Sequence, residues 1–152
     1  MRLVSYIISN KIKIGVIVDE GQSVIDLSDL DQDLPTDMIS LIKLGSVARE
    51  RISAAIASST DIAKSYYPDL TLLAPIPTPL RNVFCVGRNY HEHAQEFHDS
   101  GFDATAGTHA IPEYPIIFTK ATTSVSGPND PIPSFLDTTN STDYEGELAV
   151  II

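Results

Sequence analysis

Asp-Tyr-Glu-Gly-Glu-Leu-Ala-Val-Ile-Ile, residues 143–152, is the stretch on which our interpretation of this chain depends. Side chains alternate between the two faces of a β-strand, so a strand here places Asp143, Glu145 and Glu147 on one face. Like charges at this spacing repel each other, and the repulsion grows as water is excluded. A hard cation bound through oxygen would relieve it, and so would solvent around the polar half of the strand. The stretch by itself leaves both interpretations open.

The composition is that of a globular chain of about domain size. Its 152 residues, 43% of them hydrophobic, are enough to bury a core. The 20 acidic residues outnumber the 10 basic ones, and a formal charge of −10 argues against nucleic acid and anionic membranes as partners. The lone Cys85 excludes an internal disulfide framework and indicates a reducing compartment. No signal region and no membrane-spanning apolar run are visible, so we expect a cytoplasmic protein.

The first residues predict strands. Apolar, β-branched runs at 2–9 and 11–18 are separated by Ser9-Asn10, which predicts a hairpin. Turn residues at 19–22 lead into a third short strand at 23–27.

Helix signals follow. Thr36 or Asp37 can cap a helix that stops at Gly45, and Ser46 can cap a second helix that ends near residues 58–59. A short strand at 70–73 precedes three prolines at every second position of 74–79, a pattern typical of an extended connector. We therefore predict an α+β fold with two domains, residues 1–74 and 75–152.

The second half has a different pattern. A buried strand is expected at 83–86, ending at Gly87, then a polar helix at 91–97 and another strand at 116–120. The intervening loop, residues 99–115, is long for a compact domain, and such loops are more often functional than idle. We expect it to act as a lid and to shape specificity.

Two side chains on the predicted helix suggest acid–base chemistry. His93 and Glu96 stand three positions apart and so share a face, and a carboxylate that orients an imidazole makes it a better general base. A solvated helix with incidental His–Glu neighbours is the alternative. Zinc is disfavoured, because the spacings of His91, His93 and His98 do not match a helical zinc motif and a second cysteine is lacking.

Two further reactive side chains have ordinary explanations. Cys85 lies in an apolar strand with nothing basic beside it in that strand, which favours a structural thiol over a nucleophile. Lys120 ends a strand beside the long loop, where it could meet a substrate carboxylate or simply face solvent.

Taken together and in order, these segments resemble the fumarylacetoacetate hydrolase family. The matching pieces are Pro75-x-Pro77-x-Pro79, then Val83-Phe84-Cys85-Val86-Gly87-Arg88-Asn89-Tyr90-x-x-His93-Ala94-x-Glu96, then Pro115-Ile116-Ile117-Phe118-Thr119-Lys120, Gly127-Pro128 and Asp143 to Val150. Each piece alone is weak, and their order makes the set specific. Residues 1–74 resemble the small N-terminal domain that many prokaryotic members carry.

The resemblance implies a β-rich, rolled catalytic fold, a homodimer, and Mg²⁺ or Mn²⁺ (with Ca²⁺ as an alternative) at the site. Glu145 and Glu147 match the two metal-binding glutamates of an E-x-E motif, and His93 with Glu96 matches the pair that activates water. Lys120 matches a commonly present lysine, a weak candidate for substrate binding. The implied reaction is metal-dependent hydrolysis or C–C cleavage of β-keto or β-diketo acids such as an acylpyruvate, fumarylacetoacetate or an oxaloacetate-like acid. Decarboxylation and keto–enol isomerisation are alternative chemistries.

The chain departs from the family pattern at its end. Members continue beyond the E-x-E strand and supply a third acidic ligand, an Asp, so we expect residues 75–152 to be the first part of the catalytic domain. A hard cation needs about six oxygen ligands, more than two glutamates supply. The alternative function is therefore a non-catalytic, dimerising or partner-binding fragment that needs a missing C-terminal segment for activity.

Overall fold

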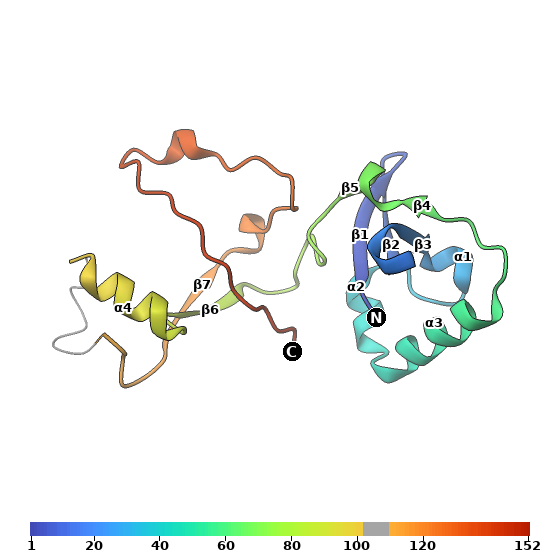
Figure 1. Cartoon of the computed structure of the whole chain (residues 1–152), viewed down its shortest axis with the longest axis horizontal. Coiled ribbons are helices and arrows are strands. Elements are labelled where there is room, and N and C mark those ends of the chain that lie inside the picture. Colours follow the sequence, from blue (N-terminus) through green and yellow to red (C-terminus); the bar gives the residue numbers. More distant parts are fainter. Residues whose placement is uncertain (102–109) are drawn as a thin grey trace.

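The computed structural model describes residues 1–101 and 110–152. The described residues form a five-stranded sheet with three α-helices, followed by a two-stranded sheet with one α-helix (Figure 1). This mixture confirms the α+β fold class. The predicted loop at 99–115 lies partly outside the described residues.

The predicted hairpin is confirmed by strands β1 (Leu3–Ile8) and β2 (Lys11–Val18), which pair antiparallel. Ser9 and Asn10 between them have φ angles of 49° and 60°. Two consecutive left-handed residues make a turn whose twist matches that of the flanking strands, and Asn tolerates this conformation well. The turn sets the register that pairs Ile8 with Lys11.

The first sheet is completed by three short strands. The predicted third strand is β3 (Ser23–Asp26), which pairs with β2. At the edges, β4 (Ser65–Tyr66) pairs with β3 and β5 (Thr71–Leu72) pairs with β1, so the order is β4-β3-β2-β1-β5, antiparallel throughout. Only β4 was absent from the prediction, because two residues are too short to leave a sequence pattern.

Three helices pack with this sheet: α1 (Leu27–Leu30), α2 (Met38–Lys43) and α3 (Ser46–Ser58). Asp37 caps α2 as predicted, since its side chain accepts a hydrogen bond from Ser40 N. The predicted cap of α3 was wrong. Ser46 is the first helical residue, and the cap position belongs to Gly45, whose φ of 57° needs the conformational freedom of glycine.

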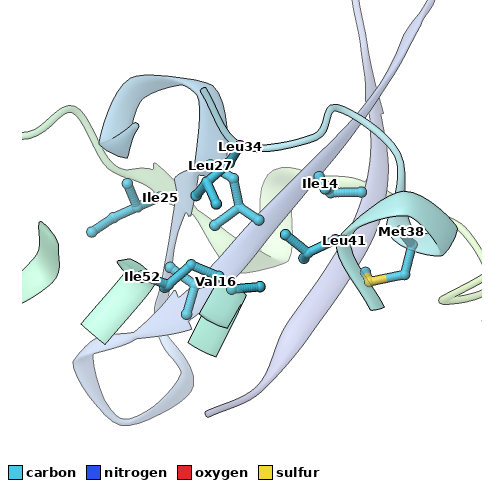
Figure 2. Close-up of a cluster of buried hydrophobic side chains, with 9 residues drawn as sticks. Ile14, Val16, Ile25, Leu27, Leu34, Met38, Leu41 and Ile52 are labelled. Atoms are coloured by element: carbon cyan, nitrogen blue, oxygen red, sulfur yellow. The ribbon is translucent and has the colours of Figure 1, made fainter. Parts of the chain in front are cut away.

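The buried core lies between this sheet and its helices (Figure 2). Leu27, Leu41 and Ile52 are each at most 2% exposed. The full cluster is Ile14, Val16, Ile25, Leu27, Leu34, Met38, Leu41, Ala48 and Ile52. Burial of this kind is the dominant favourable term in folding.

A polar network crosses the same region. The Tyr6 hydroxyl, on a side chain only 2% exposed, donates to Asp26 Oδ2 at 3.1 Å. Lys13 Nζ lies 3.1 Å from the same oxygen, and the backbone N and hydroxyl of Ser28 donate to Asp26 Oδ1 at 2.9 and 2.7 Å. Burial raises the pKa of the Tyr6 phenol, and the nearby Asp26 charge raises it further.

The proline-rich connector carries no helix or strand between β5 and β6. Its first residues remain attached to the first sheet, because Ser5 Oγ donates to the carbonyl of Pro75 at 2.7 Å and Ile76 packs against the core. The division into domains at residue 75 stays a prediction.

Beyond the connector, β6 (Val83–Gly87) and β7 (Ile116–Lys120) pair antiparallel, and α4 (His91–Asp99) lies between them in the chain. Both strands and the helix were predicted, but the expected burial of the strand was wrong. Phe84 is 71% and Ile117 63% exposed. Two strands leave broad faces open unless another layer packs on them, and no residue of β6 or β7 is fully buried.

The strand expected at 143–152 does not form. These residues belong to no helix or strand and are exposed. A strand is defined by a hydrogen-bonded neighbour, and among the described residues no strand pairs with this stretch. The alternation of polar and apolar side chains suggested a strand, but it does not supply the backbone hydrogen bonds to a neighbouring strand that define one.

Candidate functional site

The candidate site begins where β6 turns into α4. Arg88 follows the strand with a φ of 54°, a left-handed conformation that is uncommon for a residue other than glycine. Its guanidinium carbon lies 5.5 Å from the centroid of the Phe97 ring, a cation–π distance that connects the turn to the last turn of the helix. Tyr90 is the N-cap of α4, and its carbonyl accepts from Ala94 N at 2.9 Å. The backbone here places His93 at the end of the first helical turn.

His93 meets one of the two predicted metal ligands. Its Nε2 lies 3.3 Å from Glu145 Oε1, across 52 positions of sequence, and the two side chains are 29% and 53% exposed. This separation is within ion-pair distance, and the contact is a true ion pair when the imidazole is protonated. The structure therefore brings His93 and Glu145 together.

Glu96 has different surroundings. It lines a shallow, open depression on α4 together with His91, Glu92, Gln95 and Asp99, a set that does not include His93. Within the described part of the chain, its carboxylate makes no hydrogen bond or ion pair. The predicted side-chain contact between His93 and Glu96 is thus not made in this structure, and the catalytic role of Glu96 stays a prediction.

The remaining predicted residues stand apart. Glu147 is exposed, and among the described residues its carboxylate has no ion pair. Lys120 is the last residue of β7, pairs with Val83 in the ladder and is exposed. Their roles as metal ligand and substrate contact stay predictions.

A divalent cation requires more oxygen ligands than the side chains around Glu145 supply. Residues 1–101 and 110–152 contain no group of three or more His, Cys, Asp or Glu side chains that could hold a metal ion. Mg²⁺ takes near-octahedral coordination by oxygen, and Ca²⁺ takes six to eight oxygen ligands. Glu145 with a neighbouring imidazole does not supply this, so the described residues do not by themselves fit the ion that the resemblance implies.

Two contacts at this site were missed by sequence reasoning. Leu148 N donates to the Tyr90 hydroxyl at 3.1 Å, which connects the acidic stretch to the start of α4. Upstream, the carboxylate of Asp137 accepts hydrogen bonds from Thr139, Ser141 and Thr142. An Asp followed by Ser and Thr is a turn signal that sequence could have provided. A tyrosine that meets a distant backbone amide has no such local signature.

Comparison with known proteins supports the family resemblance. The sequence model described as "Fumarylacetoacetate (FAA) hydrolase C-terminal" matches residues 82–152, the stretch that contains His93, Lys120 and Glu145. This segment of the chain is similar to the fumarylacetoacetate hydrolase family. The resemblance proposed from the sequence motifs is thereby confirmed.

Individual relatives extend the match over both halves of the chain. Oxaloacetate tautomerase YisK of Bacillus subtilis is 34% identical over 155 residues, covering 94% of this chain and 48% of that protein. The mitochondrial oxaloacetate tautomerase fahd2 of Xenopus laevis is 32% identical over 154 residues, covering 100% of this chain and 44% of that protein. The chain spans about half the length of these curated relatives.

A solved structure agrees on the fold. The fumarylacetoacetate hydrolase of psychrophilic Exiguobacterium antarcticum has a TM-score of 0.53 and 26% sequence identity, over 90% of this chain and 41% of that one. The chain therefore shares its α+β arrangement with the corresponding part of a fumarylacetoacetate hydrolase. None of the helices in the described residues has the length and apolar character needed to cross a membrane.

Proposed function

We propose that this chain contributes the general-base part of an enzyme that interconverts keto and enol forms of a short oxo acid such as oxaloacetate. The observation that carries the proposal is the placement of His93 Nε2 3.3 Å from Glu145 Oε1. The two relatives named oxaloacetate tautomerase support this chemistry over cleavage.

Tautomerisation requires only that a proton moves. A base removes it from the carbon next to the carbonyl, the electron pair of that C–H bond forms the C=C bond, and the carbonyl oxygen gains a proton. An imidazole suits this step because its ordinary pKa lies near physiological pH, and positioned bases of this kind contribute roughly 10²–10⁴-fold in rate. Glu145 would hold the ring of His93 in the orientation and tautomer needed.

The hydrolase or lyase activity expected from the sequence is the competing chemistry within the same family. It needs water activated beside the carbonyl, the role predicted for His93 with Glu96. A divalent cation, Mg²⁺ or Mn²⁺, stays a prediction with Glu145 and Glu147 as its first candidates. The described residues do not assemble a full ligand set for this ion. A keto-acid substrate and a homodimer likewise belong to this proposal.

One assay separates these reactions. The 152-residue chain is incubated with oxaloacetate, with and without Mg²⁺ or Mn²⁺, while enol absorbance is followed by ultraviolet spectroscopy and products by NMR. Tautomerisation changes the keto–enol relaxation rate without new products. Hydrolysis yields oxalate and acetate, and decarboxylation yields pyruvate and carbon dioxide. Acceleration of none of these would contradict the enzymatic proposal for this chain.

Variants assign the residues. His93→Ala should lower the tautomerisation rate by roughly 10²-fold or more, whereas His91→Ala, an exposed histidine two positions away, serves as the matched control. Glu145→Gln and Glu96→Gln then show which carboxylate supports His93. A loss of tautomerase activity in Glu145→Gln alone would support the His93–Glu145 contact seen here. A loss of activity in Glu96→Gln alone would favour the His93–Glu96 pairing predicted from sequence.

A second candidate function rests on a separate observation. The register of β6 and β7 places Phe84, Val86 and Ile117 on one face of the ladder, where they are 71%, 37% and 63% exposed, and an exposed apolar face of this kind is typical of an interface. A dimerising or partner-binding role needs no turnover. An inactive chain that self-associates through this sheet, as shown by sedimentation of wild type against Phe84→Ser, would favour it.

A further inference from the structure

The hydrogen bond between Leu148 N and the Tyr90 hydroxyl gives the candidate site a feature that the proposed function does not use. It joins residues 58 positions apart at 3.1 Å. Leu148 directly follows Glu147, so the bond fixes the backbone at the downstream end of the segment that carries both glutamates. We infer that Tyr90 is a positioning residue, which holds residues 145–148 against the start of α4 so that Glu145 stays beside His93. Its relevance to catalysis rests on the proposed function.

The helix places two contacts on the segment. Tyr90 and His93 are three residues apart at the start of α4, and they meet Leu148 and Glu145, which are also three residues apart. The order is reversed, with the earlier helix residue meeting the later segment residue. Two contacts fix both the position and the direction of the segment relative to the helix, whereas the His93–Glu145 contact alone would leave it free to pivot.

Tyr90 is suited to this role by its place at the N-cap. Its backbone has φ −109° and ψ 140°, and its side chain makes no capping hydrogen bond to the helix. The phenol oxygen instead accepts from the amide of the distant Leu148. Because α4 begins at the next residue, any movement of the helix start moves Tyr90 and His93 together.

The upstream end of the segment is held as well. Asp137 Oδ1 accepts from Thr139 N and Oγ1 at 2.9 and 2.7 Å. Asp137 Oδ2 accepts from Ser141 N, Thr142 N and Thr142 Oγ1 at 2.7, 2.6 and 2.7 Å. These bonds close the loop that ends immediately before Asp143. Residues 143–148 have no hydrogen-bonded partner strand among the described residues. The Asp137 loop holds the upstream end of this segment, and the hydrogen bond to Tyr90 holds its downstream end.

The test removes one oxygen atom. Tyr90→Phe deletes the acceptor and keeps the ring, and Tyr144→Phe, at a side chain that is 89% exposed, is the matched control. Amide hydrogen exchange of the chain is followed residue by residue by NMR. Loss of one hydrogen bond should accelerate exchange at Leu148 by roughly 2- to 10-fold in Tyr90→Phe. Tyr144→Phe should leave it at the wild-type rate.

The pattern of exchange separates positioning from general stability. Unchanged exchange at Leu148 in Tyr90→Phe would overturn the inference. So would equal acceleration across β6 and β7, because Tyr90 would then stabilise the region as a whole. In an active chain we expect the kcat of Tyr90→Phe to fall by roughly 2- to 10-fold with KM little changed, and faster exchange with unchanged kcat would also overturn it.

The two proposals fail in different ways. Full turnover in His93→Ala would contradict the proposed function, and the exchange rate at Leu148 would still decide whether Tyr90 holds the segment. Loss of turnover in His93→Ala together with wild-type exchange in Tyr90→Phe would contradict the positioning role alone.

Discussion

The two sheets of this chain are built from similar residues and differ in what covers them. The strands β1 to β3 place Ile14, Val16 and Ile25 against the helices, where each is at most 4% exposed. On β6 and β7, the equally apolar Phe84 and Ile117 face outward. Among the described residues, every buried apolar side chain except Ala74 and Ala94 lies between residues 6 and 52. A strand sequence therefore sets the pairing, while burial depends on a second layer.

The largest expected effect comes from a core truncation. Leu41 is 2% exposed, so Leu41→Ala should lower the free energy of unfolding by about 2–5 kcal/mol through lost burial and the cavity that remains. Ile117→Ala on the open sheet, at a side chain 63% exposed, should change it by about 0.5 kcal/mol or less. Urea unfolding of the two variants measures the difference. Similar losses would show that β7 is buried in solution and would end the contrast between the sheets.

Packing can also be tested by adding a methyl group at one of two glycines, Gly15 in the first sheet and Gly146 in the exposed stretch 143–152. A Cβ atom at Gly15 would lie 2.8 Å from the carbonyl oxygen of Ile25 and still closer to Val24 Cγ1, whereas one at Gly146 would meet nothing within 4 Å. Gly15→Ala should therefore cost about 1–3 kcal/mol by overpacking. Gly146→Ala should leave the thermal unfolding midpoint almost unchanged. A tolerated alanine at residue 15 would mean that β2 and β3 can separate locally.

The polar network of the first sheet makes its stability depend on pH. Burial raises the pKa of Asp26, but the hydrogen bonds from Ser28, Lys13 and Tyr6 outweigh burial and hold the pKa below its usual value. Because the pKa of Asp26 is lower in the folded than in the unfolded state, its ionised carboxylate stabilises the fold above about pH 4. This contribution is lost as the pH falls further and the carboxylate is protonated.

The comparison is between wild type and Asp26→Asn. The variant should cost about 1–3 kcal/mol near neutral pH, because it weakens a partly buried, charge-assisted set of hydrogen bonds. It should then lose less stability than wild type when the pH falls from about 5 to about 3. Denaturant titrations at several pH values measure this. Parallel pH curves would show that other carboxylates account for the acid sensitivity.

The smallest expected effect is at a surface ion pair of the same region. Lys64 Nζ lies 2.8 Å from Asp19 Oδ2, with side chains 44% and 45% exposed. Exposed pairs contribute little, so Lys64→Ala should leave the free energy of unfolding almost unchanged, and the difference should shrink further in high salt. A larger loss would mean that charge as well as packing separates the two regions.

Much of the local structure was predictable from sequence. Ser9-Asn10 favours the left-handed turn of the first hairpin, and Asp37 has the side chain that caps α2. The helix at 91–99 and the strands at 83–87 and 116–120 follow from periodicity and flanking turn residues. These features depend on residues close together in the chain, whose steric and hydrogen-bonding preferences act locally.

The family assignment was predictable for a different reason. Several motifs in a fixed order are specific even when each is weak, and the matched stretch 82–152 contains all of those in the second half. The prediction of a strand at 143–152 was wrong, because alternating side chains show which residues would share a face of a strand but do not provide a partner strand to pair with.

The sequence alone determined where this chain turns, caps its helices and carries its carboxylates and histidines. The tertiary structure decided which of them meet: His93 lies beside Glu145, across 52 positions, while Glu96, three residues away, forms no hydrogen bond or ion pair with His93. Local geometry places i and i+3 on one helix face, but it does not say what approaches that face. Contacts such as Tyr90 with Leu148 depend on the path of the whole chain between them, which no short pattern records.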